Sequence, residues 1–199
     1  LMAAYRSTAF PVTIVRPSHT YNGTKPPVCV HGAKGNWQIL KRIMEDKPVI
    51  IPGDGSSLWT LTHSDDFARG YVGLMGNPHA IGHAYHITSD ESMTWNQIYE
   101  TIAEALGKPL NALHVASDFL ARHSGPYDFR GELLGDKSSS VVFDNTKIKR
   151  AVPDFVCTVS MAEGLRQSVV YMLDHPETQV EDPEFDRWCD RIVMAQRAA

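Results

Sequence analysis

A short run of β-branched residues bounded by prolines, Phe10–Pro17, constrains the fold of this chain more than any other feature. Its apolar side chains fall on both faces of an extended segment. A strand with two apolar faces is typical of a parallel sheet that helices cover on both sides. The run therefore predicts an α/β protein.

Strands and helices alternate along the rest of the chain, which supports the α/β class. Strands are expected at 49–51, 57–62 and 83–88, and helices at 36–46, at 65–75, from 94 and from 160. The last two helices each open with a capping box, Thr94-x-x-Gln97 and Ser160-x-x-Glu163. A loop rich in Gly, Pro, Asn and Lys spans residues 18–35. Loops of that length are usually functional or mobile.

Composition excludes several classes of protein. The chain has 199 residues, 43% of them hydrophobic and 21% charged, which excludes disordered, collagen-like and coiled-coil proteins. No apolar run approaches the ~20 residues that a membrane span needs. The net charge of −4 gives no support to a general nucleic-acid binder.

Cysteine usage and the first residue bear on the origin of the chain. Three widely separated cysteines argue against a disulfide scaffold and for a reducing compartment, so we expect a cytoplasmic protein. The chain starts at Leu1, without Met and without a signal-peptide pattern. We therefore expect it to be a piece of a longer protein.

Two segments are candidates for ligand binding. Gly32–Asn36 directly precedes a predicted helix, and its glycines, Lys34 and the helix N-terminus offer N–H donors and positive charge to a phosphate or carboxylate. A mobile loop with an ordinary N-cap is the alternative, and the segment lacks the ending of a P-loop. Ser18 and His19 follow the Phe10–Pro17 strand, and open α/β sheets bind ligands outside the carboxyl ends of their strands. The alternative for His19 is a loop cap.

Other chemistries receive little support. His83 and His86 are three residues apart on a predicted strand, so their side chains point to opposite faces. No CxxC or HExxH pattern is present, and we expect no metal site. No Gly-x-Ser-x-Gly is present for nucleophilic catalysis.

Four segments resemble, in order and spacing, the extended short-chain dehydrogenases/reductases, the NAD-dependent epimerase/dehydratase family. They are Pro11–Tyr21, Thr62–Ala68, His86–Ser89 with the helix from Thr94, and Gly135–Asp136 followed by Asp144–Lys147. The resemblance implies a C-terminal portion of such a Rossmann-type enzyme: the last parallel strand or strands plus a smaller mixed α/β substrate-binding domain. Residues 1–35 would be a remnant of the dinucleotide-binding domain, and 36–199 mainly the substrate-binding region with returning strand and helix segments.

The resemblance also implies a cofactor and a set of site residues. The family binds NAD(P) at Gly-x-x-Gly-x-x-Gly and transfers a proton with Tyr-x-x-x-Lys, and neither motif occurs here. We therefore expect NAD or NADP in the complete enzyme, no tight binding by this fragment, and no catalytic residue or turnover within it. By analogy, the cofactor contacts are Pro17, Ser18 and His19, and the substrate contacts are His19, Lys34, Asn36 and Trp59.

Two departures from the family pattern concern the substrate. Nucleotide-sugar enzymes of the family place an arginine where this chain has Trp59, and another where it has Leu133 or Leu134. An arginine–phosphate pair is bidentate and charge-assisted, and neither Trp nor Leu can replace it. Lys34, Arg122 and Arg130 are the candidate cations that would replace these two arginines.

The resulting hypothesis is an NAD(P)-dependent epimerase/dehydratase-like oxidoreductase. Its substrate would be a sugar-like or other hydroxyl or carbonyl compound and not a nucleotide sugar. The complete enzyme would be a homodimer without a membrane partner.

Two alternatives from other classes stay open. Some chloroplast relatives of the family bind RNA, and the loss of both arginines suits a repurposed pocket. The net charge of −4 and the lack of a basic stripe count against RNA. The other alternative is a non-catalytic binding protein, such as a stand-alone ligand-binding or oligomerisation domain.

Overall fold

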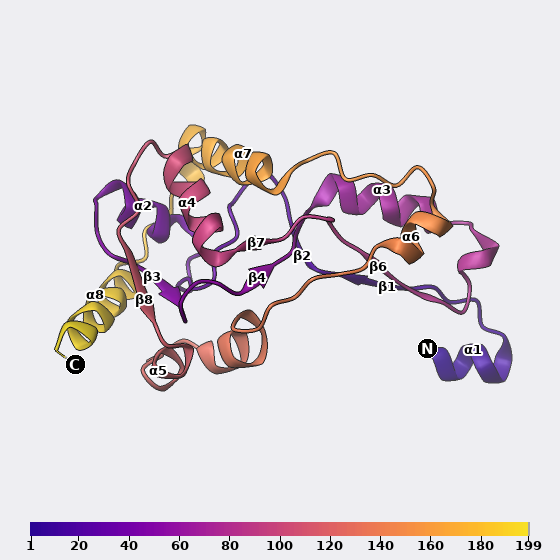
Figure 1. Cartoon of the computed structure of the whole chain (residues 1–199), viewed down its shortest axis with the longest axis horizontal. Coiled ribbons are helices and arrows are strands. Elements are labelled where there is room, and N and C mark those ends of the chain that lie inside the picture. Colours follow the sequence, from indigo (N-terminus) through magenta and orange to yellow (C-terminus); the bar gives the residue numbers. More distant parts are fainter. Residues whose placement is uncertain (199) are drawn as a thin grey trace. The chain divides into compact units, whose positions relative to one another are not determined.

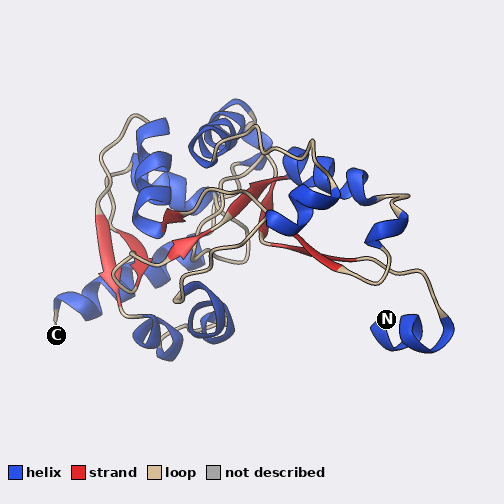
Figure 2. Ribbon diagram, turned by 45° about the vertical axis from the view of Figure 1, so that its right-hand side comes forward, coloured by secondary structure: helices blue, strands red, loops and turns tan. Residues whose placement is uncertain are grey.

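The structure is a computed structural model that describes residues 1–198 (Figures 1 and 2). The chain divides into two compact units, each assembled from separate stretches of sequence. Unit 1 consists of Leu1–Asn22, Thr60–Ser92 and Val142–Met161, and unit 2 of Gly23–Trp59, Met93–Val141 and Ala162–Ala199. Within residues 1–198, every helix is too short or too polar to cross a lipid bilayer.

Unit 1 is built on parallel strand pairs. Its elements are α1 (Met2–Thr8), β1 (Ile14–Pro17), β2 (His19–Tyr21), β5 (Leu61–His63), α3 (Ser64–Leu74), η1 (Pro78–Ala80), β6 (Ala84–Ile87) and α6 (Thr146–Ala151). Strand β1 pairs in parallel with β6, and β2 with β5. Helix α3 connects β5 to β6, as Figure 1 shows, and a helical crossover of this kind is what parallel strands require.

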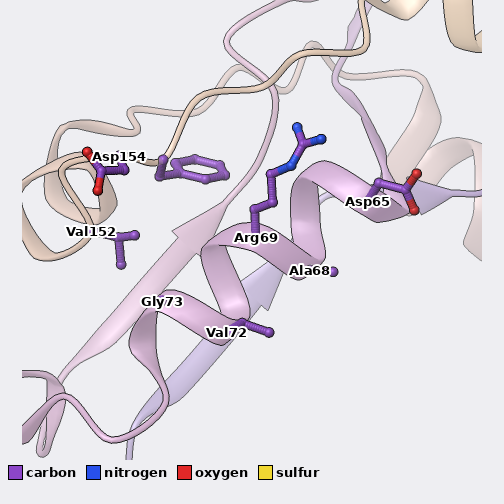
Figure 3. A pocket seen from close by; sticks show the side chains of 8 residues that line it. Asp65, Ala68, Arg69, Val72, Gly73, Val152 and Asp154 are labelled. Atoms are coloured by element: carbon purple, nitrogen blue, oxygen red, sulfur yellow. The ribbon is translucent and has the colours of Figure 1, made fainter.

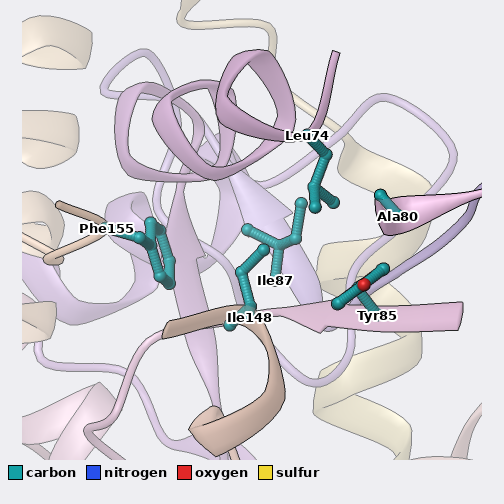
Figure 4. Packing of buried hydrophobic residues seen from close by; sticks show 6 residues of the cluster. All are labelled: Leu74, Ala80, Tyr85, Ile87, Ile148 and Phe155. Atoms are coloured by element: carbon teal, nitrogen blue, oxygen red, sulfur yellow. The ribbon is translucent and has the colours of Figure 1, made fainter. Parts of the chain in front are cut away.

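The core of unit 1 lies between α3, α6 and strand β6. Figure 4 shows its buried cluster, which consists of Leu74, Ala80, Tyr85, Ile87, Ile148 and Phe155. Gly70 lets α3 approach the sheet closely, because a Cβ there would lie 2.6 Å from Cγ2 of Ile87. The alternation of apolar residues along β6 and the glycine on α3 therefore fix how the helix packs.

Unit 2 is mainly helical. Its elements are α2 (Trp37–Met44), β3 (Val49–Pro52), β4 (Leu58–Trp59), β7 (Met93–Thr94), α4 (Trp95–Ala105), β8 (Ala112–Val115), α5 (Ser117–Arg122), the π-helix η2 (Arg130–Lys137), α7 (Met161–Asp174, beyond its first residue), η3 (Pro176–Thr178) and α8 (Pro183–Arg197). Strands β3 and β8 pair in parallel, and β4 and β7 pair antiparallel.

A buried ion-pair cluster joins α2 to α8 within unit 2. The fully buried Arg42 guanidinium donates to Asp186 Oδ1 at 2.6 Å and to Asp190 Oδ1 at 2.9 Å. Its Nε donates to the carbonyl of Pro48 at 3.0 Å. A buried cation needs this many acceptors, since any unpaired N–H would carry its full desolvation cost.

Most predicted elements occur within a few residues of their expected bounds. The capping box at Thr94 and Gln97 is present with both of its hydrogen bonds, and α7 begins directly after Ser160. The strand expected at 57–62 is divided at Thr60. Its first part, β4, pairs with β7 in unit 2, whereas its second part, β5, pairs with β2 in unit 1.

The expected fold class needs a correction. The chain is α/β, as expected. The expectation that it is a C-terminal portion, with the last strand or strands of the sheet and a smaller mixed α/β domain, is wrong. Strand β1 finds its parallel partner in β6, and α3 supplies the crossover, so the chain has a Rossmann-like α/β arrangement. The sequence could not show this because the two partners are separated by all of the stretch Gly23–Trp59, which packs in unit 2.

Candidate ligand site at the carboxyl ends of parallel strands

Three hydroxyl side chains follow or end the parallel strands of unit 1. Ser18 follows β1, Thr62 lies in β5, and Ser89 comes shortly after β6. The Ser18 Oγ and Thr62 Oγ1 atoms are 2.8 Å apart, and the Ser89 backbone N–H donates to Thr62 Oγ1 at 2.9 Å. Thr62 is fully buried, whereas Ser18 is half-buried. The buried threonine therefore connects the ends of β1 and β6.

An aromatic pair lies next to these residues along β2 and β5. The rings of Tyr21 and His63 meet edge to face, with centroids 5.5 Å apart. The Tyr21 hydroxyl is buried and has no hydrogen-bond partner among the described atoms. Burial, together with the carboxylates of Asp66 and Glu91, raises the pKa of Tyr21, so the phenol keeps its proton at neutral pH.

His63 also starts helix α3. Its Nδ1 accepts the Asp65 backbone N–H at 3.3 Å, so the imidazole is the N-cap of the helix. In this bond Nδ1 is the acceptor, so a neutral ring carries its proton on Nε2.

Asp66 fixes the corner between β5 and α3. This carboxylate is 1% exposed and accepts the N–H groups of Thr158 at 2.9 Å and Val159 at 3.0 Å. It also accepts the Thr158 hydroxyl at 3.1 Å and the Arg69 guanidinium at 2.7 Å. The carboxylate therefore accepts four hydrogen bonds inside unit 1. Its role is to fix the backbone at residues 158–159, and it does not bind a ligand.

Asn145 fixes the segment that follows β6. Its Nδ2 donates to the carbonyls of Thr88 at 2.8 Å and Ser89 at 3.2 Å, and to Asp90 Oδ1 at 3.0 Å. The Thr88 hydroxyl donates to Asn145 Oδ1 at 3.0 Å. Burial acts against ionisation of Asp90, but Lys149 and Asn145 outweigh it and lower its pKa. The Ser89 N–H is thus held in place toward Thr62.

A cavity of about 650 Å³ lies on the outer side of α3 (Figure 3). Its lining combines apolar side chains with charged groups at the rim: Asp65, Ala68, Arg69, Val72, Gly73, Val152, Asp154 and Phe155. The Arg69 guanidinium is already paired with Asp66 and with the Thr158 hydroxyl. None of the hydroxyls at the strand ends lines this cavity.

The predicted cofactor contacts all lie at this end of unit 1. Pro17 is exposed and faces Ile87 in the β1–β6 register. His19 begins β2, faces Leu61 in register and is half-buried. Ser18 enters the hydroxyl network through Thr62. Cofactor contact by these three residues stays a prediction.

The predicted anion segment Gly32–Asn36 of unit 2 contacts a carboxylate of the chain itself. The Lys34 backbone N–H donates to Asp182 Oδ2 at 3.1 Å, and the Phe185 N–H donates to Asp182 Oδ1 at 3.1 Å. Asp182 is 3% exposed, and a Cβ at Gly32 would lie 2.2 Å from its Oδ2. The segment therefore has the chemistry that its residues predict, but its anion is internal.

The other predicted substrate contacts are also engaged within unit 2. Asn36 precedes α2, and its Nδ2 donates to the carbonyl of Pro26 at 2.7 Å. Trp59 is buried and stacks on Trp95, with centroids 5.5 Å apart. Its indole N–H is buried without an acceptor among the described atoms. Substrate binding by Lys34, Asn36 and Trp59 stays a prediction.

Thr62, Ser89, Tyr21 and His63 were not selected from the sequence. The signal for the first two was available, because both lie at or just beyond the end of a predicted strand, as Ser18 does. Among residues 1–198, no group of three or more His, Cys, Asp or Glu side chains is arranged to hold a metal ion.

Comparisons with known proteins agree with the Rossmann-like α/β arrangement. The model of the "NAD dependent epimerase/dehydratase family" matches residues 1–88. A "2'-dehydrokanamycin reductase" from Streptomyces kanamyceticus is 29% identical over 121 residues, which are 61% of this chain and 33% of that protein.

Solved structures share the fold. An epimerase from Methanothermobacter thermautotrophicus superposes with a TM-score of 0.67 at 19% identity and covers 88% of this chain and 47% of its own. A UDP-glucuronic acid 4-epimerase from Bacillus cereus, in complex with NAD, gives a TM-score of 0.60 at 20% identity, over 85% of this chain and 46% of its own. The match therefore spans about half the length of these two structures. It spans 33% of the length of the curated relative.

The match corrects one expectation from the sequence. The expected C-terminal part of a family enzyme, without its cofactor-binding half, is wrong. The family model matches residues 1–88, which contain β1, β5, α3 and β6 of the Rossmann-like arrangement.

Proposed function

We propose that this NAD-dependent epimerase/dehydratase-like chain belongs to an oxidoreductase that reduces or oxidises a sugar-like small molecule, and that unit 1 binds the nicotinamide end of the cofactor. The observation that carries the proposal is the Ser18–Thr62–Ser89 network at the carboxyl ends of parallel strands. Ligands of open α/β sheets bind at that end.

The residues of unit 1 fit the amide-bearing part of NAD. Ser18 is half-buried, so its hydroxyl is accessible at the end of β1, and it can exchange hydrogen bonds with a carboxamide. His19 and Pro17 flank it as the predicted neighbours of the cofactor and substrate. When bound, the cofactor supplies or accepts the hydride. The chain contributes orientation, and the Tyr21 phenol stays protonated and therefore uncharged at this edge.

The substrate class follows from unit 2. By the resemblance, Trp59 and either Leu133 or Leu134 stand where nucleotide-sugar enzymes have arginines. Trp59 and Leu133 are buried, whereas Leu134 is 43% exposed. Buried apolar side chains cannot hold a diphosphate. The similar protein from Streptomyces kanamyceticus is named for the reduction of a kanamycin ketone. Together these support an aminated, sugar-like hydroxyl or carbonyl compound as substrate, with Lys34, Asn36 and Trp59 as its contacts.

Ligand-observed NMR on the 199-residue chain tests the proposal. We expect saturation transfer to nicotinamide mononucleotide and to kanamycin, and none to UDP-glucose. The Ser18→Ala variant should give a weaker mononucleotide signal and keep the kanamycin signal. Transfer to UDP-glucose without transfer to kanamycin would contradict the substrate class, and no transfer to the mononucleotide would contradict the cofactor site.

A filter assay with single-stranded RNA tests the RNA-binding alternative. Retention that falls steeply with salt would favour that alternative, because phosphate contacts release counterions. We expect no retention.

A further inference from the structure

The hydroxyl of Thr62 has a role besides packing in the core. Thr62 is 0% exposed, and its single hydroxyl oxygen takes part in two hydrogen bonds, one with a backbone N–H and one with a side-chain hydroxyl. Valine has the same shape and would satisfy the packing alone. A hydroxyl at this buried position therefore needs its hydrogen bonds as an explanation.

The donor inventory settles the direction of one of the two bonds. Ser89 N–H can only donate, so Thr62 Oγ1 is its acceptor. In the 2.8 Å bond between Thr62 and Ser18, either hydroxyl can be the donor. An oxygen that accepts a hydrogen bond becomes a better donor, because hydrogen bonds in a chain polarise one another, and this favours Thr62 as the donor to Ser18 Oγ.

Ser18 is the last member of this chain of bonds. If its oxygen accepts from Thr62, its own proton is free for an acceptor outside the network. No other hydrogen bond of its side chain is formed with the described residues. Ser18 is also half-buried, so the proton can reach a ligand at the carboxyl end of β1.

We propose that Thr62 is a positioning residue that makes Ser18 a hydrogen-bond donor to a carbonyl oxygen of the bound ligand, through the order Ser89 N–H, Thr62 O–H, Ser18 O–H. The ligand class is a neutral amide or ketone, and nicotinamide is the amide that the proposed function supplies. This inference rests on the proposed function for the identity of that amide. Asn145 Nδ2 donates to the Ser89 carbonyl and so holds the Ser89 end of the network before the ligand arrives.

Titrations of nicotinamide mononucleotide into the wild type and four variants test the inference. Thr62→Val should weaken binding about tenfold, the equivalent of one charge-neutral hydrogen bond. Thr62→Ser restores the hydroxyl and should bind within about twofold of the wild type. Ser18→Ala should weaken binding as much as Thr62→Val, and the double variant should be no weaker than either single variant, because both act on one bond.

Amide hydrogen exchange separates the outcomes. Exchange at Ser89 should accelerate in Thr62→Val and stay unchanged in Ser18→Ala. Equal mononucleotide affinity of wild type and Thr62→Val would overturn the inference and leave the proposed function standing. Additive losses in the double variant would also overturn it, since Thr62 would then act on packing alone. Failure of the wild type to bind the mononucleotide overturns the proposed function and, with it, the role of Thr62.

Discussion

Two segments of this chain present hydrogen-bond donors at the end of a secondary-structure element, and they use them differently. In unit 2 the N–H groups at Lys34 and Phe185 converge on the buried Asp182 carboxylate. In unit 1 the network through Thr62 ends at the half-buried Ser18. One set of donors is consumed inside the fold, and the other ends on a hydroxyl near solvent. The donors at Asp182 are therefore occupied by the chain itself, whereas the network at Ser18 is the one proposed for a ligand.

The same contrast explains which predicted site residues remain available. Asn36 and the Lys34 backbone are held by Pro26 and Asp182 in unit 2. In unit 1 the buried Asp66 carboxylate is taken up by residues 158–159 and Arg69, and among residues 1–198 the side-chain hydrogen bond of Ser18 is to Thr62. Substitutions that remove the internal carboxylate should therefore leave the N–H donors of its segment available to a ligand.

The largest effect is expected from removal of the Asp66 carboxylate. Asp66→Ala leaves the N–H groups of Thr158 and Val159 buried without acceptors, and should lower the free energy of unfolding by about 3 kcal/mol. Urea denaturation of both proteins measures this loss. The matched control is Asp65→Ala, next to it on α3, whose side chain is 73% exposed and whose removal should cost less than about 1 kcal/mol. Equal losses in the two variants would contradict the role given to Asp66.

Removal of the internal anion should open a ligand site in unit 2. Asp182→Ala leaves the Lys34 and Phe185 N–H groups without their acceptor and should destabilise the protein by about 2 kcal/mol. Added phosphate should then raise the melting temperature of the variant more than that of the wild type. Glu181→Ala, its exposed neighbour, should show no such gain. A phosphate response that is the same in all three proteins would remove the contrast between the two segments.

The ion pairs of α2 and α8 predict a pH dependence. Burial acts against ionisation of Asp186, but Arg42 and Lys47 outweigh it and lower its pKa in the folded state. Stabilisation by Asp186 is therefore fully present above the ordinary aspartate pKa of about 4, and is lost as the pH falls through the lower folded value. The stability gap between wild type and Asp186→Asn should be constant from pH 5 to 7 and shrink below about pH 4. A gap that widens on acidification would contradict this sign.

The smallest effect concerns the thiols. Burial raises the pKa of Cys29 to about 12, although Tyr99 and Lys137 act against the rise, and burial also raises that of Cys189 to about 12. Both thiols should resist alkylation by iodoacetamide at pH 8 in the native protein and react quickly in urea. Burial also raises the pKa of Cys157 to about 12, but this thiol is only half-buried, so it serves as the internal reference and should react first because of its greater exposure. Mass spectrometry of the modified peptides gives the order, and early modification of Cys29 would contradict it.

The sequence predicts local structure better than it predicts partners. Capping at Thr94 and the apolar stripes of the helices are local signals, and the structure confirms these elements. The division of residues 57–62 between two units and the pairing of β1 with β6 depend on distant residues. No local pattern encodes such a pairing.

The candidate site shows the same limit. Ser18 was found from its place after a strand, but Thr62 and Ser89 become its partners only through the parallel pairing. Gly32–Asn36 was selected for its donors, and the acceptor Asp182 lies far along the chain. The residue types therefore predict the chemistry of a segment, and the fold decides whether a ligand or the chain itself uses it.

A titration of nicotinamide mononucleotide followed by ¹H–¹⁵N correlation spectra of the 199-residue chain most directly tests whether the open network of unit 1 is the ligand site. We predict saturable shifts of the amides at 18–19, 62–63 and 88–89, with the amides of 32–36 and of Asp182 unchanged. Shifts confined to 32–36 and Asp182, or no saturable shift at all, would contradict it.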